Sequence, residues 1–216
     1  MFARTGRVKA SPVLDHPALP PVRRHRLELD LARAPLPGAE LEARFGWRRW
    51  RPELTPVISI VLHESFRSGL DAALIPALAT LEGSDEMVRN TAANCRFIPE
   101  GAWLIERWQG RSTPALPCGA ILCIEAGRGV VQVQTLGVLP EFRGRGLGRA
   151  LLVRALRSCR ALGCQVAQLD VTACNRSAGQ LYRSLGFRVR QVFFRRIEAA
   201  PGSAIRDPEN APRACL

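Results

Sequence analysis

The feature that most constrains the fold is a strand-like run that leads through a glycine-rich loop into an amphipathic helix. Residues 130–138 form the run, which follows the hairpin signal Gly127-Arg128-Gly129. Beyond the loop, leucine, alanine and cysteine recur at three- and four-residue steps from Leu147 to Leu162, and Gly163 is a candidate C-cap. This order of strand, glycine loop and helix predicts an α/β domain with a ligand site at the start of the helix.

The loop itself is Arg143-Gly144-Arg145-Gly146-Leu147-Gly148, with Arg149 directly after it. A helix N-terminus offers unpaired N–H groups and partial positive charge, and glycines let a phosphate come close to the backbone. The Gly-x-Gly-x-x-Gly spacing fails because Arg149 stands in place of the third glycine. The P-loop spacing fails because Gly148 is followed by Arg149 and Ala150. The loop therefore predicts an anion site that is neither a dinucleotide motif nor a P-loop, and a plain turn stays open as the alternative.

The flanking residues make the interpretation more specific. The first segment is Leu136-Gly137-Val138-x-Pro140-x-x-Arg143-Gly144-x-Gly146-x-Gly148-x-x-Leu151-Leu152, and the second is Leu169-x-Val171-x-x-x-Asn175-x-x-Ala178-x-x-Leu181-Tyr182-x-x-x-Gly186-Phe187. Together they resemble the acetyl-CoA signature of the Gcn5-related N-acetyltransferase (GNAT) family over residues 130–190. The N-terminal half resembles that family only in the order of its elements.

The resemblance implies a single α/β domain with a mixed, mostly antiparallel sheet, flanked by helices and splayed at the cofactor site between Val138 and Val171. It implies acetyl-CoA as the cosubstrate. Backbone groups of three residues would pair with the pantetheine arm: Leu136, Gly137 and Val138. Backbone N–H groups of the loop would hold the pyrophosphate: Arg143, Gly144, Arg145, Gly146, Leu147, Gly148 and Arg149. Asn175 would contact the pantetheine side.

The activity that the resemblance implies is direct transfer of an acetyl group to a primary amine in a ternary complex. Tyr182 occupies the motif position of a general acid, and a phenol can protonate a departing thiolate. The competing interpretation is a tyrosine that packs under the Gly186-Phe187 turn. A backbone N–H near Val138 is a candidate oxyanion donor. A non-catalytic acyl-CoA-binding sensor or interaction module is the alternative function.

The sequence shows no carboxylate at the position where the general base is expected. Gln132 lies where many relatives carry a carboxylate, and a glutamine cannot take a proton. The candidates left open are a water chain, Glu106, Glu125 and the pair His63-Glu64, with Gln132 and Gln134 as alternative ligands of the acceptor. No role is assigned to the tryptophans Trp47, Trp50, Trp103 and Trp108.

Other patterns predict the remaining elements. Strands are expected at 27–31, 102–108, 118–125, 166–171 and 187–197, with a short helix at 177–184. Two or three short helices are expected within 52–94, one of them starting after Ser84 or Asp85. The proline-rich segment 1–21 and the segment 199–216 are expected to be tails around a domain at 22–198.

The net charge of +12 and the pI near 10.9 indicate attraction to anions such as nucleic acid, membrane phosphate or a phosphorylated cofactor. The arginines are dispersed, which argues against a nucleic-acid arm, and the stretch 44–51 is expected to be a solvated face. An RNA-binding protein with an incidental loop is the third hypothesis.

The seven cysteines contain no Cys-x-x-Cys pair, so they are expected to be reduced, mostly buried, and not part of a metal site. The chain shows no membrane-length apolar run and no signal-peptide pattern, which predicts a cytoplasmic protein without membrane partners. The acceptor, the strict identity of the acyl group and the oligomeric state, including a homodimer, stay open.

Overall fold

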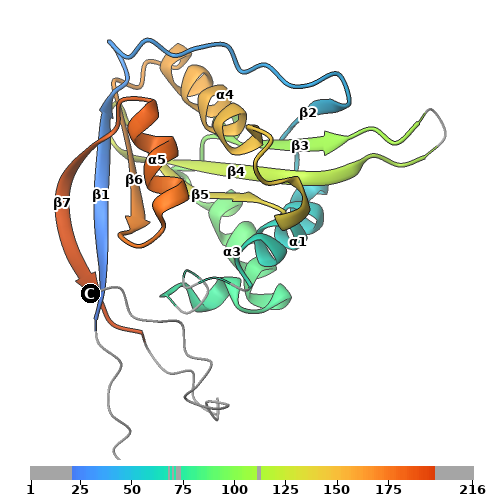
Figure 1. The fold of residues 1–216 in the computed structure, drawn as a ribbon, viewed down its shortest axis with the longest axis horizontal. Helices are drawn as coiled ribbons and strands as arrows, with labels where there is room; N and C mark the ends of the chain where they lie inside the picture. Colours follow the sequence, from blue (N-terminus) through green and yellow to red (C-terminus); the bar gives the residue numbers. More distant parts are fainter. Residues whose placement is uncertain (1–20, 68, 70, 72–73, 111–112, 198–216) are drawn as a thin grey trace, which may run out of the picture.

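The computed structural model describes residues 21–67, 69, 71, 74–110 and 113–197, so the two predicted tails lie outside it apart from Pro21. The described chain builds one seven-stranded sheet with helices on both faces (Figure 1). Its strands are β1 (Val22–Asp30), β2 (Phe45–Arg49), β3 (Trp103–Arg107), β4 (Leu116–Gly127), β5 (Val130–Val138), β6 (Val166–Thr172) and β7 (Arg188–Arg195). Its helices are α1 (Thr55–Phe66), α3 (Leu81–Ala93), α4 (Leu147–Ala161) and α5 (Arg176–Ser184).

The strand order is β2-β3-β4-β5-β6-β1-β7. Only β5 and β6 are parallel neighbours, and every other pair is antiparallel, which confirms the predicted mixed, mostly antiparallel sheet. The sequence did not predict that the first strand, β1, lies between β6 and β7, near the end of the sheet that is far from β2. There Arg24 of β1 pairs with Thr172 of β6.

The sheet opens between β5 and β6. The two strands pair only where Val130–Gln132 meets Val166–Gln168, and the rest of β5 follows β4 instead. Opposite β4, Gln134 is the extra residue of a β-bulge, because Leu122 pairs with Thr135 and Cys123 with Val133. A bulge bends its strand and strengthens the local twist. The predicted splay is therefore present, and the bulge gives it a physical cause.

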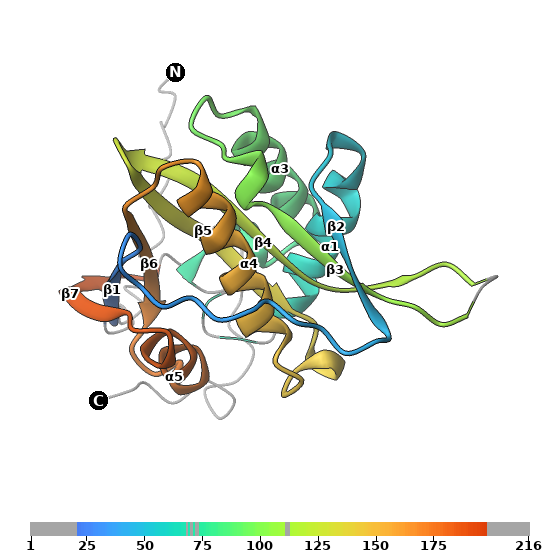
Figure 2. The same ribbon diagram turned by 90° about the horizontal axis from the view of Figure 1, so that it is seen from above.

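Each face of the sheet has its own core. Helices α4 and α5 cover one face, where the buried side chains include Val131, Leu151, Leu152, Leu156 and Leu169. Helices α1 and α3 cover the other face, where they include Ile58, Leu62, Val88, Leu104 and Leu122. Figure 2, seen from above, shows α4 lying across the sheet with α5 beside β1 and β6. The cleft between β5 and β6 is therefore bordered by elements from both layers.

Most predicted elements are confirmed within a few residues, and two expectations were wrong. The stretch 44–51 is not only a solvated face, since Phe45–Arg49 forms the edge strand β2 and Phe45 is buried. Helix α3 begins at Leu81 rather than after Ser84 or Asp85. Thr80 caps it, because the Thr80 hydroxyl oxygen accepts a hydrogen bond from the N–H of Gly83 at 3.0 Å.

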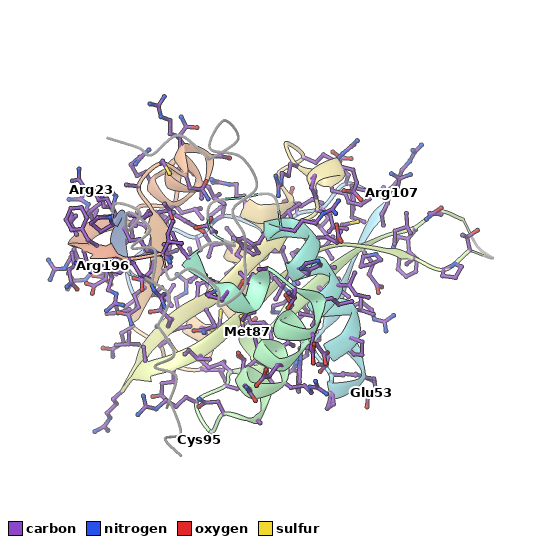
Figure 3. All side chains as sticks on the ribbon, turned by 90° about the horizontal axis from the view of Figure 1, so that it is seen from below. Arg23, Glu53, Met87, Cys95, Arg107 and Arg196 are labelled. Atoms are coloured by element: carbon purple, nitrogen blue, oxygen red, sulfur yellow. The ribbon has the colours of Figure 1, made fainter. Side chains whose placement is uncertain are left out.

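The remaining sequence expectations concern charge and cysteines. Figure 3 shows basic side chains at both ends of the molecule, with Arg23 and Arg196 near the β1–β7 edge and Arg107 at the other end. No disulfide joins any of the six described cysteines; Cys118, Cys123 and Cys159 are fully buried and Cys95 is exposed. No described helix is long and apolar enough to cross a membrane. In the described part of the chain no group of His, Cys, Asp and Glu gathers as a metal would need.

Candidate acetyl-CoA cleft

A cavity of about 450 Å³ occupies the opening between β5 and β6. That volume falls in the range typical of small-molecule sites, roughly 300–1,000 Å³. Its lining includes Leu136, Gly137 and Val138, the loop residues Arg143, Gly144, Gly146, Leu147, Gly148 and Arg149, and Asn175 and Tyr182. Of the residues predicted to bind the cofactor or to donate the proton, only Arg145 is absent from this lining. Residues of the segments 136–149 and 175–182, at least 26 positions apart in the sequence, thus meet in one cleft.

The glycine loop presents backbone rather than side chains to the cleft. Gly144 and Gly146 have φ values of 75° and 74°, a left-handed conformation that favours glycine, and a Cβ on either would meet no atom within 4 Å. Gly146 is the N-cap of α4, where no side chain caps the helix and no acidic residue occupies the first turn. The first N–H groups of α4 have no intrahelical partner. They leave hydrogen-bond donors at the positive end of the helix dipole, an arrangement that can hold an anion.

Arg143 has a different position from the rest of the loop. Its backbone N–H donates to the Pro140 carbonyl at 3.2 Å. Its guanidinium donates to the carbonyl oxygens of Val138 at 3.1 Å and Ser65 at 2.7 Å. The side chain therefore fastens the loop to the end of β5 and to α1. The N–H groups open to a ligand begin after Arg143.

The free edge of β5 supplies a second set of backbone groups. Leu139 donates its N–H to the Cys118 carbonyl of β4, and alternate residues of a strand point to opposite edges, so Leu136 and Val138 direct their backbone groups into the gap. The backbone N–H and C=O groups of Gly137 point toward β4. A Cβ on Gly137 would lie 2.8 Å from Cβ of Ser65, so this glycine lets α1 approach the strand.

The position of Tyr182 is compatible with both interpretations of its sequence, the proton donor and the packed ring. It lines the cleft, and its ring also packs against Phe187 with centroids 6.0 Å apart. Burial raises the pKa of Tyr182 to about 12; the negative charge of Asp71 adds to this rise and the positive charge of Arg24 opposes it. The phenol is therefore protonated at neutral pH and can act as a hydrogen-bond donor.

Asn175 organises the wall opposite the loop. Its side-chain oxygen accepts from the N–H of Ala178 at 3.1 Å, which caps α5, and its amide nitrogen donates to Asp71 at 3.3 Å. Asp71 also accepts from the Thr172 hydroxyl at 2.7 Å.

The sequence did not indicate several contributors to this site. Asp71, Ser65 and Phe142 line the cavity, and Arg24 is a buried charge beside it. The Ser65 hydroxyl is buried and has no hydrogen-bond partner among the described residues. Phe142 stands at a variable position inside the first motif segment, and Arg24, Ser65 and Asp71 lie outside both segments, so no local pattern indicated them.

The general-base candidates from the sequence do not line the cleft. His63 contacts the Leu78 carbonyl through Nδ1 at 3.1 Å, and Glu64 pairs with Arg67. Glu106 is buried on β3 beside Arg48, and Glu125 is exposed at the far end of β4.

The two glutamines also lie outside the cleft. Gln132 sits where β5 still pairs with β6, and its amide donates to the Val133 carbonyl at 3.4 Å. Gln134 lines a separate hollow of about 480 Å³ beside α3, together with Glu86, Met87 and Asn90. None of the four tryptophans lines the cleft. Trp47 and Trp103 instead pack against each other and under Arg154.

Residues 75–187 match the sequence model of the acetyltransferase (GNAT) family. The match includes β5, the glycine loop, β6 and α5, and more than half of the 216 residues. The chain therefore belongs to the GNAT family, which confirms the resemblance noted in the sequence.

Curated relatives and solved structures extend the comparison. Mycothiol acetyltransferases of Thermobispora bispora and Kineococcus radiotolerans are each 32% identical; the alignments cover 69% and 70% of this chain and 58% and 55% of those proteins. The chain thus spans little more than half the length of these relatives. A GCN5-related N-acetyltransferase from Sphaerobacter thermophilus has a TM-score of 0.63 at 23% identity, covering 84% of this chain and 54% of that one.

A GNAT acetyltransferase from Brucella melitensis, solved in complex with acetyl-CoA, has a TM-score of 0.51 at 20% identity and covers 74% of this chain and 91% of that one. At 23% and 20% identity, the Sphaerobacter and Brucella structures support only the fold of this chain. Together they confirm the predicted fold class.

Proposed function

We propose that this chain is an N-acetyltransferase that moves the acetyl group of acetyl-CoA directly to a primary amine. The observation that carries the proposal is the cleft in which the uncapped start of α4, the free edge of β5 and Tyr182 face one cavity. Family membership and the named activity of the mycothiol acetyltransferase relatives support it. The acetyl-CoA in the Brucella melitensis structure supports the choice of cosubstrate.

The residues of the cleft suit two parts of the cosubstrate, the pyrophosphate and the pantetheine arm. The pyrophosphate would accept hydrogen bonds from the N–H groups of the loop after Arg143 and from the first turn of α4, where no side chain competes. The amide-bearing pantetheine arm would pair with the outward backbone groups of Leu136 and Val138, in the manner of an added strand. Asn175 is available from the opposite wall.

The chemistry assigned to the protein is positioning, polarisation and proton supply. The Val138 N–H is the candidate donor to the thioester carbonyl oxygen, a contribution commonly worth about 3 kcal/mol. The Tyr182 phenol would give its proton to the sulfur as the carbon–sulfur bond breaks. Because burial keeps the phenol neutral, the proton is present throughout the ordinary pH range.

A panel of amines, incubated with acetyl-CoA and read by release of the coenzyme A thiol, tests the proposal. The panel should contain small alkyl amines, amino sugars, aminoglycosides and peptides with free N-termini or lysines. We expect at least one amine to accelerate thiol release, with the N-acetylated product identified by mass. Tight coenzyme A binding with no acceleration by any amine would instead favour the non-catalytic acyl-CoA-binding module.

A further inference from the structure

Asp71 is the one carboxylate among the described residues that line the cleft. The other charged lining residues are Arg143 and Arg149, and both belong to the phosphate side. Asp71 comes from the segment after α1, yet its hydrogen bonds reach the end of β6 and the start of α5. A negative charge therefore lies on the wall that also carries Tyr182, whereas the two arginines lie on the wall of the glycine loop.

Two side chains fix the Asp71 carboxylate. The Thr172 hydroxyl donates to Oδ1 at 2.7 Å, and Thr172 is only 2% exposed. The Asn175 amide donates to Oδ2 at 3.3 Å while its own oxygen caps α5. A carboxylate offers about four lone-pair directions, so each oxygen keeps capacity for a further donor. The group is held in place and can still bind a ligand.

A buried arginine compensates the charge of Asp71. Arg24, carried in by the inserted strand β1, is 6% exposed, and its Nη2 donates to the Asp170 carbonyl at 3.2 Å. Burial lowers the pKa of Arg24, and the negative charges of Asp71 and then Asp170 oppose that shift. The Nε of Arg24 has no partner among the described residues. The guanidinium of Arg24 therefore places a positive charge near the Asp71 carboxylate.

We propose that Asp71 binds the ammonium group of the acceptor and takes the first proton from its nitrogen. The inference rests on the proposed function. It assigns the missing base to a residue that lies outside the family signature, and it restricts the acceptor to amines that are cationic at neutral pH. A weakly basic nitrogen or a hydroxyl would gain nothing from this carboxylate.

The proton balance follows from the two groups on this wall. The ammonium gives one proton to Asp71, and the freed nitrogen lone pair forms the bond to the acetyl carbonyl carbon. The carbon–sulfur bond breaks with its electron pair on sulfur, and the thiolate takes the proton of Tyr182. A second proton from the nitrogen restores the phenol. The products are the amide, the coenzyme A thiol and a protonated Asp71, which releases its proton to water.

The test compares two nucleophiles that differ in charge at pH 7, ethanolamine as the cation and hydroxylamine as the mostly neutral one. Asp71→Asn keeps the size of the side chain and an oxygen for the Thr172 hydroxyl. We expect kcat/KM for ethanolamine to fall about 10²- to 10⁴-fold, the usual contribution of a positioned base. For hydroxylamine we expect a fall of less than about 10-fold, since its nitrogen needs no deprotonation before attack.

Glu64→Gln is the matched control, because it removes a carboxylate from α1 just before this segment, outside the lining of the cleft. It should leave both rates unchanged. The phenolate absorbance of Tyr182, the single tyrosine of the chain, reports whether Asp71→Asn keeps the structure of the cleft. In Asp71→Asn the phenolate absorbance should titrate at a lower pH than in the original chain and still above about 10, the value of a free tyrosine.

Equal losses for the two nucleophiles, or no loss for ethanolamine, would overturn the assignment of Asp71. If the unchanged chain transfers acetyl groups to no amine of the panel, the proposed function itself fails, and this is visible without any variant. If it transfers acetyl groups only to uncharged nitrogens, the proposed function survives and the role of Asp71 is refuted.

Discussion

The two walls of the cleft present different chemical groups to a ligand. The wall formed by the glycine loop and the edge of β5 offers backbone N–H and C=O groups from one contiguous stretch of chain. The wall formed by β6 and α5 offers side chains, and these come from β1, the segment after α1, β6 and α5. Backbone groups suit a ligand part that is the same in every turnover, such as a pyrophosphate. Gathered side chains suit the proton chemistry and the choice of acceptor.

The largest effect that separates the walls should come from Tyr182→Phe. Removal of the hydroxyl deletes the proposed proton donor and leaves the ring on Phe187, so kcat should fall about 10²- to 10⁴-fold. The affinity for coenzyme A, measured by calorimetry, should stay within about 2-fold, because the loop is untouched. A comparable loss of affinity would mean that this wall also holds the cosubstrate.

The second prediction concerns the alkaline limit of stability. The folded pKa of Tyr182 is raised to about 12, above the unfolded value of about 10, so folding disfavours the phenolate. The associated stability is fully present below pH 10 and is lost as the pH rises toward 12, in total roughly 2–3 kcal/mol.

Urea unfolding of the original chain and of Tyr182→Phe between pH 8 and 12 measures this difference directly. The loss of stability should be smaller in the variant, which has no tyrosine to titrate. Parallel pH curves for the two proteins would contradict the raised pKa.

The backbone wall can be probed with two glycines at the two ends of α4. Gly146 and Gly163 both have positive φ, 74° and 91°, and neither has an atom within 4 Å of a built Cβ. Gly146→Val and Gly163→Val should each destabilise the fold by about 1–2 kcal/mol. Only Gly146→Val should weaken coenzyme A binding, by roughly 10- to 100-fold, or about 1.4–2.7 kcal/mol.

Thermal unfolding and calorimetry on the same samples separate these two effects. Equal losses of coenzyme A affinity in the two variants would show that conformational strain alone, and not contact with the ligand, explains the need for glycine.

The smallest effect is expected at Arg145, which is exposed and does not line the cavity. Arg145→Gln should weaken coenzyme A binding about 2- to 5-fold at low salt, and the difference should vanish near 1 M salt, where the Debye length is about 3 Å. Titrations at two salt concentrations measure it. A salt-independent loss would indicate a direct contact that the structure does not suggest.

The sequence predicted much of the fold because local patterns carry it. The period of α4, the hairpin before β5 and the glycine loop are contiguous signals, and each element appeared where the pattern indicated. The missed strand β2 and the misplaced start of α3 have local causes. Phe45–Arg49 is a short edge strand dominated by arginine and tryptophan, and Thr80 rather than Ser84 supplies the cap.

The sequence by itself determined the backbone wall, because glycines at fixed spacing before a helix specify conformation and exposed N–H groups through covalent geometry alone. The tertiary structure alone decided the side-chain wall. Arg24 and Asp71 meet Thr172 and Asn175 only after β1 inserts beside β6 and the segment after α1 reaches across the open sheet. Neighbours in space that are more than 100 residues apart in sequence leave no periodic trace in the chain. Their charges acquire a function only through the distances and burial that the fold imposes.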